Sequence, residues 1–206
     1  MDFEEWEPWY CEILEYFGFS REQDEKSARL LASLLSRDDL LSLATLIRGK
    51  EVTVCGNAPC LEHELVNIQG IVCAADAAAE VLDVHGIRPD VVFTDLDGAT
   101  ERLLDLNDSG TIVVVHAHGD NMPLLRHWVP KFKGPIVATT QSTPLPHVYN
   151  FGGFSDGDRA VFAVDALGAG HVTVIGFDLD DKNVDPMKRG KLFWARKLLL
   201  AIGYAC

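Results

Sequence analysis

The 206-residue sequence contains no apolar run of the ~18 residues that a membrane-spanning helix needs, and its first residues are acidic rather than typical of a signal peptide. The chain has only five cysteines, and none belongs to a CxxC pair. An odd number of cysteines in a chain of this length argues against a disulfide framework and favours reduced, mostly buried thiols. We therefore expect a cytoplasmic protein without a membrane partner.

Basic residues are also few. Lys and Arg together number 18, against 31 Asp and Glu, which gives a formal net charge of −13. A chain with this charge repels a phosphate backbone, so nucleic acid is not expected as a partner. Nucleotides remain compatible with the charge, because a divalent cation between carboxylate and phosphate removes the repulsion.

The rest of the composition is ordinary for a folded protein. Apolar residues make up 48% of the chain and charged residues 24%, which excludes collagen-like, disordered and coiled-coil proteins. A chain of 206 residues is long enough to bury about 70% of its unfolded surface. We expect one α/β domain, with or without a small appendage.

Residues 1–49 have the pattern of helices. Apolar side chains recur at spacings of three and four from Trp6 to Phe17, before a natural stop at Gly18. Ser20 predicts the N-cap of a second helix, and a third follows. Because this segment gathers no cluster of chemically useful side chains, we expect a scaffold that packs on the rest of the chain or on a second copy. A homo-oligomer therefore remains open.

From residue 50 onward, short β-branched runs alternate with helical stretches. Continuous apolar runs are typical of parallel strands that are covered on both faces. The predicted strands are residues 52–55, 70–74, 90–93, 111–116, 135–139 and 171–177. We predict a three-layer α/β catalytic domain over residues 50–206, with a mostly parallel, Rossmann-like sheet and helices on both faces.

The longest loop-like stretch is residues 140–154, which is rich in Pro, Gly and aromatic side chains. Long loops inside compact domains are usually functional. We therefore expect this stretch to form a lid or a pocket wall.

Polar residues follow most of the predicted strands, and open parallel sheets bind ligands beyond the carboxyl ends of their strands. Asp95 and Asp97 come directly after the strand at 90–93. Two carboxylates this close repel each other unless a cation or a proton relieves them, and hard oxygen ligands suit Mg²⁺ held together with substrate phosphates. The alternative is a solvated acidic turn, which the apolar run PDVVF before it disfavours.

The next predicted strand ends in HAHGDN. His116, His118 and Asp120 have the HxHxD spacing of a zinc-hydrolase motif, although Asn121 stands where that motif has a histidine. In the alternative, Asp120 is a further Mg²⁺ carboxylate, while His116 and His118 orient other groups or contact phosphate.

The turn GNAP after the first predicted strand is a weaker phosphate-binding candidate. Gly56 and Asn57 can present backbone N–H groups to an anion at the start of a helix. The turn matches neither GxGxxG nor a P-loop, and an ordinary strand-to-helix turn explains it equally well.

Basic residues near the start of two helices are further candidates. Arg159 lies in the first turn of a predicted helix, where the helix dipole disfavours a cation, and it needs an anionic partner such as a ligand phosphate or Asp156. Three basic residues crowd the first turns of the last helix, and six of the chain's 18 fall within 16 positions there: Lys182, Lys188, Arg189, Lys191, Arg196 and Lys197. They form either a phosphate clamp or a solvated helix face.

Together, these segments resemble the archaeal 6-hydroxymethyl-7,8-dihydropterin diphosphokinases, a group related to thiamin pyrophosphokinase. The resemblance covers nearly the whole chain and rests on GNAPC, AADAAAEVL, GIRPDVVFTDLDG, VVVHAHGDN, TTQ, GGFSDGDRAVFA and VIGFDLD. Its most specific parts are PDVVFTDLDG and HAHGDN. Ala58 and Cys60 depart from the family pattern, in which glycine and serine are usual at these positions.

The resemblance implies that ATP donates a diphosphoryl group to the hydroxymethyl group of a dihydropterin and leaves as AMP, a step towards tetrahydromethanopterin or folate-type cofactors. It implies ATP and a small pterin as ligands and Mg²⁺ as the cofactor. Asp95, Asp97 and Asp120 would hold the Mg²⁺, and His118 would complete the catalytic group.

The pterin offers amide-like edges and a flat face. On the resemblance, Asn121, Thr140 and Gln141 are the expected partners of the pterin edge. Phe151 or Phe154 would stack on its ring.

Other functions remain open at this point. FTDLDGAT also resembles the DxDG motif of haloacid-dehalogenase-like phosphatases, in which Asp95 would be the nucleophile. That motif normally follows the first strand, whereas here it follows the third. A zinc hydrolase and a non-catalytic nucleotide-binding module are the remaining alternatives.

Overall fold

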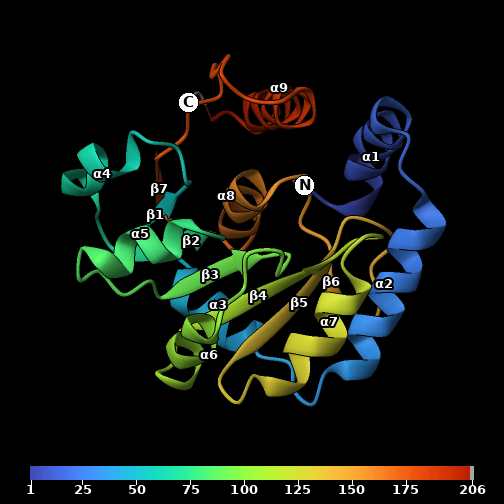
Figure 1. Cartoon of the computed structure of the whole chain (residues 1–206), viewed down its shortest axis with the longest axis horizontal. Coiled ribbons are helices and arrows are strands. Elements are labelled where there is room, and N and C mark those ends of the chain that lie inside the picture. The colour runs from blue at the N-terminus through green and yellow to red at the C-terminus, as the bar shows by residue number, and fades with distance from the viewer. Residues whose placement is uncertain (205–206) are drawn as a thin grey trace.

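The computed structural model describes residues 1–204, whose strands form a single sheet (Figure 1). The strands are β1 (Glu51–Cys55), β2 (Ile71–Ala75), β3 (Val91–Thr94), β4 (Ile112–Ala117), β5 (Ile136–Thr140), β6 (Val148–Tyr149) and β7 (His171–Ile175). They lie in the order β6-β5-β4-β3-β2-β1-β7, and every neighbouring pair is parallel. All residues of β3, β4 and β5 are buried, as the continuous apolar runs predicted.

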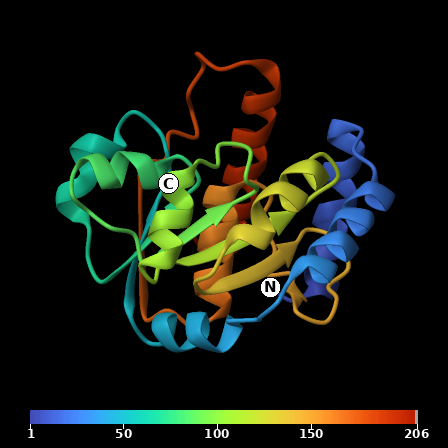
Figure 2. The same cartoon turned by 60° about the horizontal axis from the view of Figure 1, so that its bottom comes forward.

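Helices cover both faces of the sheet, which confirms the predicted three-layer α/β fold (Figures 1 and 2). The helices are α1 (Phe3–Phe17), α2 (Arg21–Leu34), α3 (Leu40–Ile47), α4 (Leu61–Glu64), α5 (Ala78–Val84), α6 (Glu101–Asp108), α7 (Met122–Trp128), α8 (Asp156–Ala166) and α9 (Pro186–Ala201), with short 3₁₀ turns at Leu65–Asn67 and Val129–Lys131. One core layer joins the sheet to α2 and to α4 through α7. The other joins it to α3, α8 and α9.

All six predicted strands are present, but β6 was not predicted. It consists of two residues inside the stretch 140–154 and pairs with β5. The Asn150 side chain donates hydrogen bonds to backbone carbonyls, including that of Gln141, and so ties the stretch to the edge of the sheet. Gln141 and Phe154, near its two ends, line the cavity described below. The ends of the stretch therefore form part of the cavity wall, one of its two expected roles.

The N-terminal helices begin and end close to the predicted positions. Asp2 forms a capping box with Glu5 at the start of α1, and Gly18 ends that helix in the left-handed conformation with φ 71°. Ser20 caps α2, which ends at Leu34. The aromatic side chains of α1 pack against α8 and α9 in a core cluster that includes Trp6, so the first helix shares a core with the end of the chain.

The described cysteines are free, and their burial varies. Cys55 and Cys73 are buried, Cys60 is half-buried and Cys11 is exposed, while Cys206 lies outside the described residues. Burial raises the pKa of Cys55 to about 12, which keeps it a thiol. Mostly buried cysteines were expected, but this holds for only two of those described. Within residues 1–204, no helix is both long enough and apolar enough to cross a membrane.

A buried asparagine on α6 predicts a test of the fold. Asn107 has no exposed surface, donates to the carbonyls of Thr111 and Pro135, and accepts from the Gly134 N–H at 2.7 Å. Asn107→Ala removes three buried hydrogen bonds, so we expect the free energy of unfolding to fall by about 3 kcal/mol in urea denaturation. Asp108→Ala, at the exposed neighbouring position, should change it by less than about 0.5 kcal/mol. Equal effects of the two would contradict this role.

Candidate active site

A cavity of about 660 Å³ opens at the carboxyl ends of the strands, the edge at which the sequence predicts ligand binding. Its walls come from the loops after the strands, the first turn of α8, one face of α9 and the corner between α1 and α2. The charged side chains that line it are Asp24, Asp76, Asp95, Asp97, Asp120, Asp156, Asp178, Asp181, Arg159, Lys188 and Lys191, with His118 beside them. Carboxylates thus outnumber cations around a space large enough for small-molecule ligands.

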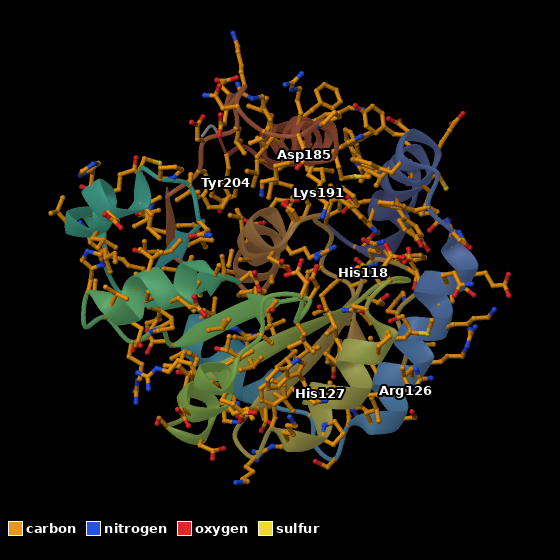
Figure 3. The ribbon with its side chains drawn as sticks, viewed as in Figure 1. His118, Arg126, His127, Asp185, Lys191 and Tyr204 are labelled. Carbon is orange, nitrogen blue, oxygen red and sulfur yellow. The ribbon has the colours of Figure 1, made fainter. Side chains whose placement is uncertain are left out.

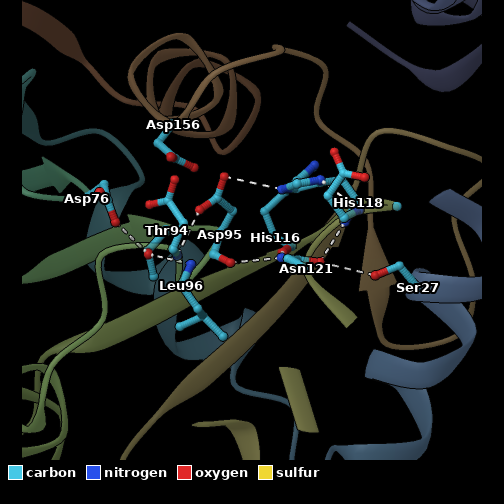
Figure 4. A network of polar contacts seen from close by, with 12 residues as sticks. Ser27, Asp76, Thr94, Asp95, Leu96, His116, His118, Asn121 and Asp156 are labelled. Atoms are coloured by element: carbon cyan, nitrogen blue, oxygen red, sulfur yellow. Dashed lines mark hydrogen bonds and ion pairs between the residues drawn. The ribbon is translucent and has the colours of Figure 1, made fainter. Parts of the chain in front are cut away.

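The loop after β3 directs two carboxylates into this cavity. Leu96 lies between Asp95 and Asp97, is fully buried, and has a positive φ of 73°. Its N–H donates to the Thr94 hydroxyl, and the Asp97 N–H donates to Asp95 Oδ1 at 3.1 Å. Because Leu96 turns into the core, Asp95 and Asp97 both line the cavity. Figure 4 shows Asp95 and Leu96 in this loop.

Two further carboxylates join this pair, although the sequence analysis did not predict them as site residues. Asp76 follows β2 with a positive φ of 47° and accepts a hydrogen bond from Thr94. Asp156 is the first residue of α8 and contacts Arg159 at 3.2 Å. In the sequence both resemble helix caps, but Asp76 also follows a predicted strand, and that position could have marked it as a site residue.

The carboxylates differ in their preference for a proton. Burial and the charge of Asp95 raise the pKa of Asp97, and burial with the other aspartates raises the pKa of Asp156 to about 8 despite Arg159. Burial opposes ionisation of Asp95 as well, but the hydrogen bond from His118 and the charge of Arg159 hold its pKa well below the usual value. Asp95 therefore loses its proton most readily in this group, whereas ionisation of Asp97 and Asp156 is disfavoured.

These carboxylates do not form a complete metal site by themselves. Within residues 1–204, no three His, Cys, Asp or Glu side chains converge as metal ligands. The predicted trio of Asp95, Asp97 and Asp120 is therefore not assembled as a protein-only site. Mg²⁺ commonly takes only one or two carboxylates and completes its octahedron with water and substrate phosphates, and the donor chemistry of Asp95 and Asp97 fits that mode.

The loop after β4 places His118 beside Asp95. His118 Nε2 lies 3.3 Å from Asp95 Oδ2, and the Asp120 N–H points at His118 Nδ1 from 3.4 Å. The carboxylate of Asp120 is exposed at the cavity wall. Both residues reach the cavity, as the sequence analysis expected of a site there.

Three residues predicted to contact a ligand, Asn121, His116 and Thr140, do not line the cavity. Asn121 is buried and donates to the carbonyls of Asp95 and His116, while its oxygen accepts from Ser27 and from the His118 N–H (Figure 4). Every polar atom of its side chain is used, so it braces the loops rather than meeting a pterin.

His116 and Thr140 also fail to reach the cavity. His116 is buried, bonds to the Thr139 hydroxyl at 3.1 Å, and burial lowers its pKa well below the usual value. Thr140 exchanges a hydrogen bond with Ser142 inside the protein. Of the two predicted stacking rings, Phe154 lines the cavity, whereas Phe151 packs in the core.

The cationic side of the cavity comes from α8 and α9. Arg159 is 9% exposed; its Nη2 donates to Gln141 Oε1, and its Nε is buried without a partner in residues 1–204. Lys188 and Lys191 lie on one face of α9, three residues apart, and both line the cavity. A guanidinium and two lysines that line one cavity form an arrangement suited to phosphate.

Lys182 and Arg189 are not part of this wall. Arg189 donates to the backbone carbonyls of Lys182 and Val184, on another face of α9. The helical period of 3.6 residues separates position 189 from the cavity-facing side and brings Lys191 to it instead. Figure 3 shows Lys191 and His118 near the middle of the molecule, with Arg126 and His127 of α7 away from them.

The turn after β1 forms part of the cavity wall, but two of its backbone N–H groups are already hydrogen-bonded. The N–H groups of Gly56 and Ala58 donate to the carbonyls of Ile175 and Gly176, so they are not available to an anion. A Cβ at position 56 would lie 2.5 Å from the Gly176 oxygen, which explains the glycine. Asn57 is exposed at the cavity edge.

The N-terminal segment also contributes to the site, contrary to the expectation of a pure scaffold. Phe19, Ser20, Gln23 and Asp24 line the cavity at the corner between α1 and α2. No local pattern marks Asp24, because a single acidic residue near the start of an amphipathic helix is ordinary. Its position becomes informative only when α2 packs beside α7 and β4.

Comparison with known proteins gives a match over most of the chain. The family model described as 6-hydroxymethylpterin diphosphokinase MptE-like matches residues 27–184. The match contains Asp95, Asp97, His118 and Arg159, and it ends before Lys188.

Three curated archaeal proteins are similar over most of the chain, and each carries the name 6-hydroxymethyl-7,8-dihydropterin pyrophosphokinase. The protein from Methanothermobacter thermautotrophicus is 37% identical, covering 97% of this chain and 94% of its own length. That from Pyrococcus furiosus is 42% identical over 86% and 78%. That from Methanocaldococcus jannaschii is 36% identical over 79% and 73%.

The raised pKa of Asp156 predicts pH-dependent stability. A carboxyl group that titrates at about 8 when folded and near 3.8 when unfolded favours the folded state below 3.8, and this contribution is lost as the pH rises through 8. We expect the Tm of the wild type to fall as the pH rises from about 4 to about 8, and the Tm of Asp156→Asn to fall less. A change of 1 kcal/mol in the free energy of unfolding corresponds to a shift of about 2–4 °C in Tm.

The control for this prediction is Asp105→Asn on α6, whose parent side chain is 70% exposed. It should keep the wild-type dependence of Tm on pH, as measured by thermal denaturation. An unchanged dependence in Asp156→Asn would show that this carboxyl is not destabilised by burial.

Proposed function

This chain belongs to the MptE-like family of 6-hydroxymethylpterin diphosphokinases, and we propose that it transfers the diphosphoryl group of ATP to the hydroxymethyl group of 6-hydroxymethyl-7,8-dihydropterin. The observation that carries the proposal is one cavity in which Asp95 and Asp97 face Arg159, Lys188 and Lys191. Cations alone would suit any anion, but cations opposite paired carboxylates suit a polyphosphate that arrives with a divalent metal.

The reaction needs charge neutralisation and alignment more than covalent chemistry. The hydroxymethyl oxygen forms a bond to the β-phosphorus. The bond from that phosphorus to the oxygen that bridges it to the α-phosphorus breaks, and AMP leaves with the electron pair. Arg159 lines the cavity and is held in place by Asp156 through Nη1 and by Gln141 through Nη2, so it presents a positioned cation to a phosphate oxygen. Lys188 and Lys191 neutralise further phosphate charge from α9.

Mg²⁺ is the cofactor that we propose for Asp95 and Asp97. When bound, it would neutralise phosphate oxygens and orient the triphosphate. The low pKa of Asp95 keeps one ligand ionised, and a cation would relieve the repulsion that raises the pKa of Asp97. The exposed carboxylate of Asp120 is the candidate to accept the proton of the attacking hydroxyl, because the ring nitrogens of His118 already contact Asp95 and the Asp120 N–H.

The pterin is best accommodated at the end of the cavity formed by the α1–α2 corner. Phe19 and Phe154 line the wall there and offer aromatic surface to a flat ring. Asn121 and Thr140 are unavailable to its edge, because their side chains are bonded inside the protein. Ser20 and Gln23 are among the polar groups at this end.

The phosphatase alternative is not favoured. Asp95 follows the third strand along the chain, not the first, and all three similar curated proteins carry the pyrophosphokinase name. The Thr139 hydroxyl, which would serve as the second motif of such an enzyme, donates to the Val115 carbonyl and does not line the cavity.

Product analysis tests the reaction type. With ATP, Mg²⁺ and 6-hydroxymethyl-7,8-dihydropterin, we expect AMP and the pterin diphosphate ester to form in equal amounts, and chelation of Mg²⁺ by EDTA to stop both. Chromatography of the nucleotides and pterins gives the measurement. Release of orthophosphate without AMP, or a trapped aspartyl-phosphate, would instead support a phosphatase.

Asp97→Asn tests the metal-binding role. Loss of this carboxylate should lower kcat by at least about 1,000-fold, because the metal contributes several kcal/mol to the transition state. The fold should be retained, since the substitution removes a repelled charge. Asp105→Asn, at an exposed position of α6, should keep wild-type kcat. Steady-state AMP release and Tm provide the two readouts, and a fully active Asp97→Asn enzyme would refute the role.

A further inference from the structure

A buried carboxylate on α2 holds two parts of the cavity wall without a cation of its own. Asp24 is 3% exposed, and it forms no ion pair among the described residues. It accepts three hydrogen bonds instead, from the Tyr10 hydroxyl at 2.7 Å, from Gln141 Nε2 at 2.8 Å and from the Gly119 N–H at 2.7 Å. A carboxylate is costly to bury, and three donors offset that cost.

The first consequence concerns the amide of Gln141. A carboxylate only accepts hydrogen bonds and a guanidinium only donates them, so an amide between the two has one possible orientation. Gln141 therefore turns its NH₂ group to Asp24 and its oxygen to Arg159 Nη2, at 3.2 Å. Its backbone carbonyl is held in turn by Trp6 Nε1 at 2.8 Å. By accepting from the NH₂ group of Gln141, Asp24 turns the Gln141 oxygen towards Arg159 as a hydrogen-bond acceptor.

The second consequence concerns the loop after β4. Asp24 Oδ1 holds the Gly119 N–H, between His118 and Asp120. A Cβ at position 119 would lie 2.8 Å from Gln23 Cβ, so α2 approaches this loop as closely as a glycine permits. The position of His118 beside Asp95 therefore depends on α2 as well as on the sheet.

We infer that Asp24 is a positioning residue for the transfer reaction, which acts by orienting Gln141 towards Arg159 and by fixing the loop that carries His118. The inference rests on the proposed function, in which Arg159 contacts the phosphates. It makes the N-terminal helices part of the catalytic apparatus, although Asp24 lies before the segment that the family model matches.

The test is an exchange of the acid and the amide between positions 24 and 141. In Asp24→Asn, the introduced side chain has one oxygen and cannot accept hydrogen bonds from both Gly119 and Gln141 as the carboxylate does. The Gly119 N–H is fixed in the backbone and keeps the oxygen, whereas the amide of Gln141 can rotate. A reversed Gln141 would point its NH₂ group at Arg159, and we expect kcat/KM for ATP to fall about 100-fold. Gln141→Glu alone places two carboxylates in contact and should also lower it.

The double variant Asp24→Asn/Gln141→Glu restores both contacts, because the introduced carboxylate can accept from the introduced amide and from Arg159 together. We expect it to exceed either single variant in kcat/KM for ATP by at least about tenfold. A purely structural role for Asp24 would make the two losses add. Additive losses, or a loss confined to the KM for the pterin, would overturn the inference.

Tyr10→Phe is the matched control. It removes one hydrogen bond from the same carboxylate but leaves the bonds to Gln141 and Gly119. We expect a lower Tm with kcat/KM unchanged, and a loss of activity equal to that of Asp24→Asn would count against positioning.

Failure of the proposed function is recognised separately, by absence of AMP formation in the wild type. The wild type, the two single variants and the double variant are then compared by their affinity for α,β-methylene-ATP with Mg²⁺ in calorimetry. Rescue of that affinity in the double variant would still support the orientation of Arg159 by Asp24, and its absence would refute it.

Discussion

Negative charge crowded at the carboxyl edge of the sheet is the constraint on which the site depends. Asp76, Asp95, Asp97 and Asp156 repel one another, and only Arg159 among the described cations lies in contact with the group. Such an arrangement is stable only if protons are retained or further cations arrive, since burial and like charge both disfavour ionisation. The metal-bound polyphosphate that we propose as the ligand would supply positive charge to the carboxylates and would itself be neutralised by Arg159 and the lysines of α9.

Backbone geometry maintains this crowding. Leu96 and Asp76 have positive φ values, which are strained for residues other than glycine, and each is held in place by what surrounds it. Leu96 is anchored by complete burial, and Asp76 by the Thr94 hydroxyl, which also accepts from the Leu96 N–H. One threonine at the end of β3 thus connects two of the loops that form the acidic group.

The walls of the cavity come from parts of the chain that are far apart in sequence. A parallel sheet brings the ends of its strands to one edge, and α9 and the α1–α2 corner then close the space above it (Figure 1). Asn121, behind the wall, and Asp24, in the wall itself, hold neighbouring loops through their hydrogen bonds, so these polar side chains act as braces of the cavity. The site is therefore as much a property of this buried network as of the side chains that face the ligand.

The sequence by itself determined six of the seven described strands, the edge of the sheet at which the cavity lies, and the place of Asp95 and Asp97 at that edge, because apolar runs and the polar residues that follow them are local patterns. Only the tertiary structure decided which polar residues face the cavity. Lys191 replaces Arg189 because of the rotation of α9, and Asp24 enters because α2 packs against the loop after β4. The direction of a side chain and its burial depend on what packs against it, and that information is spread over the whole chain.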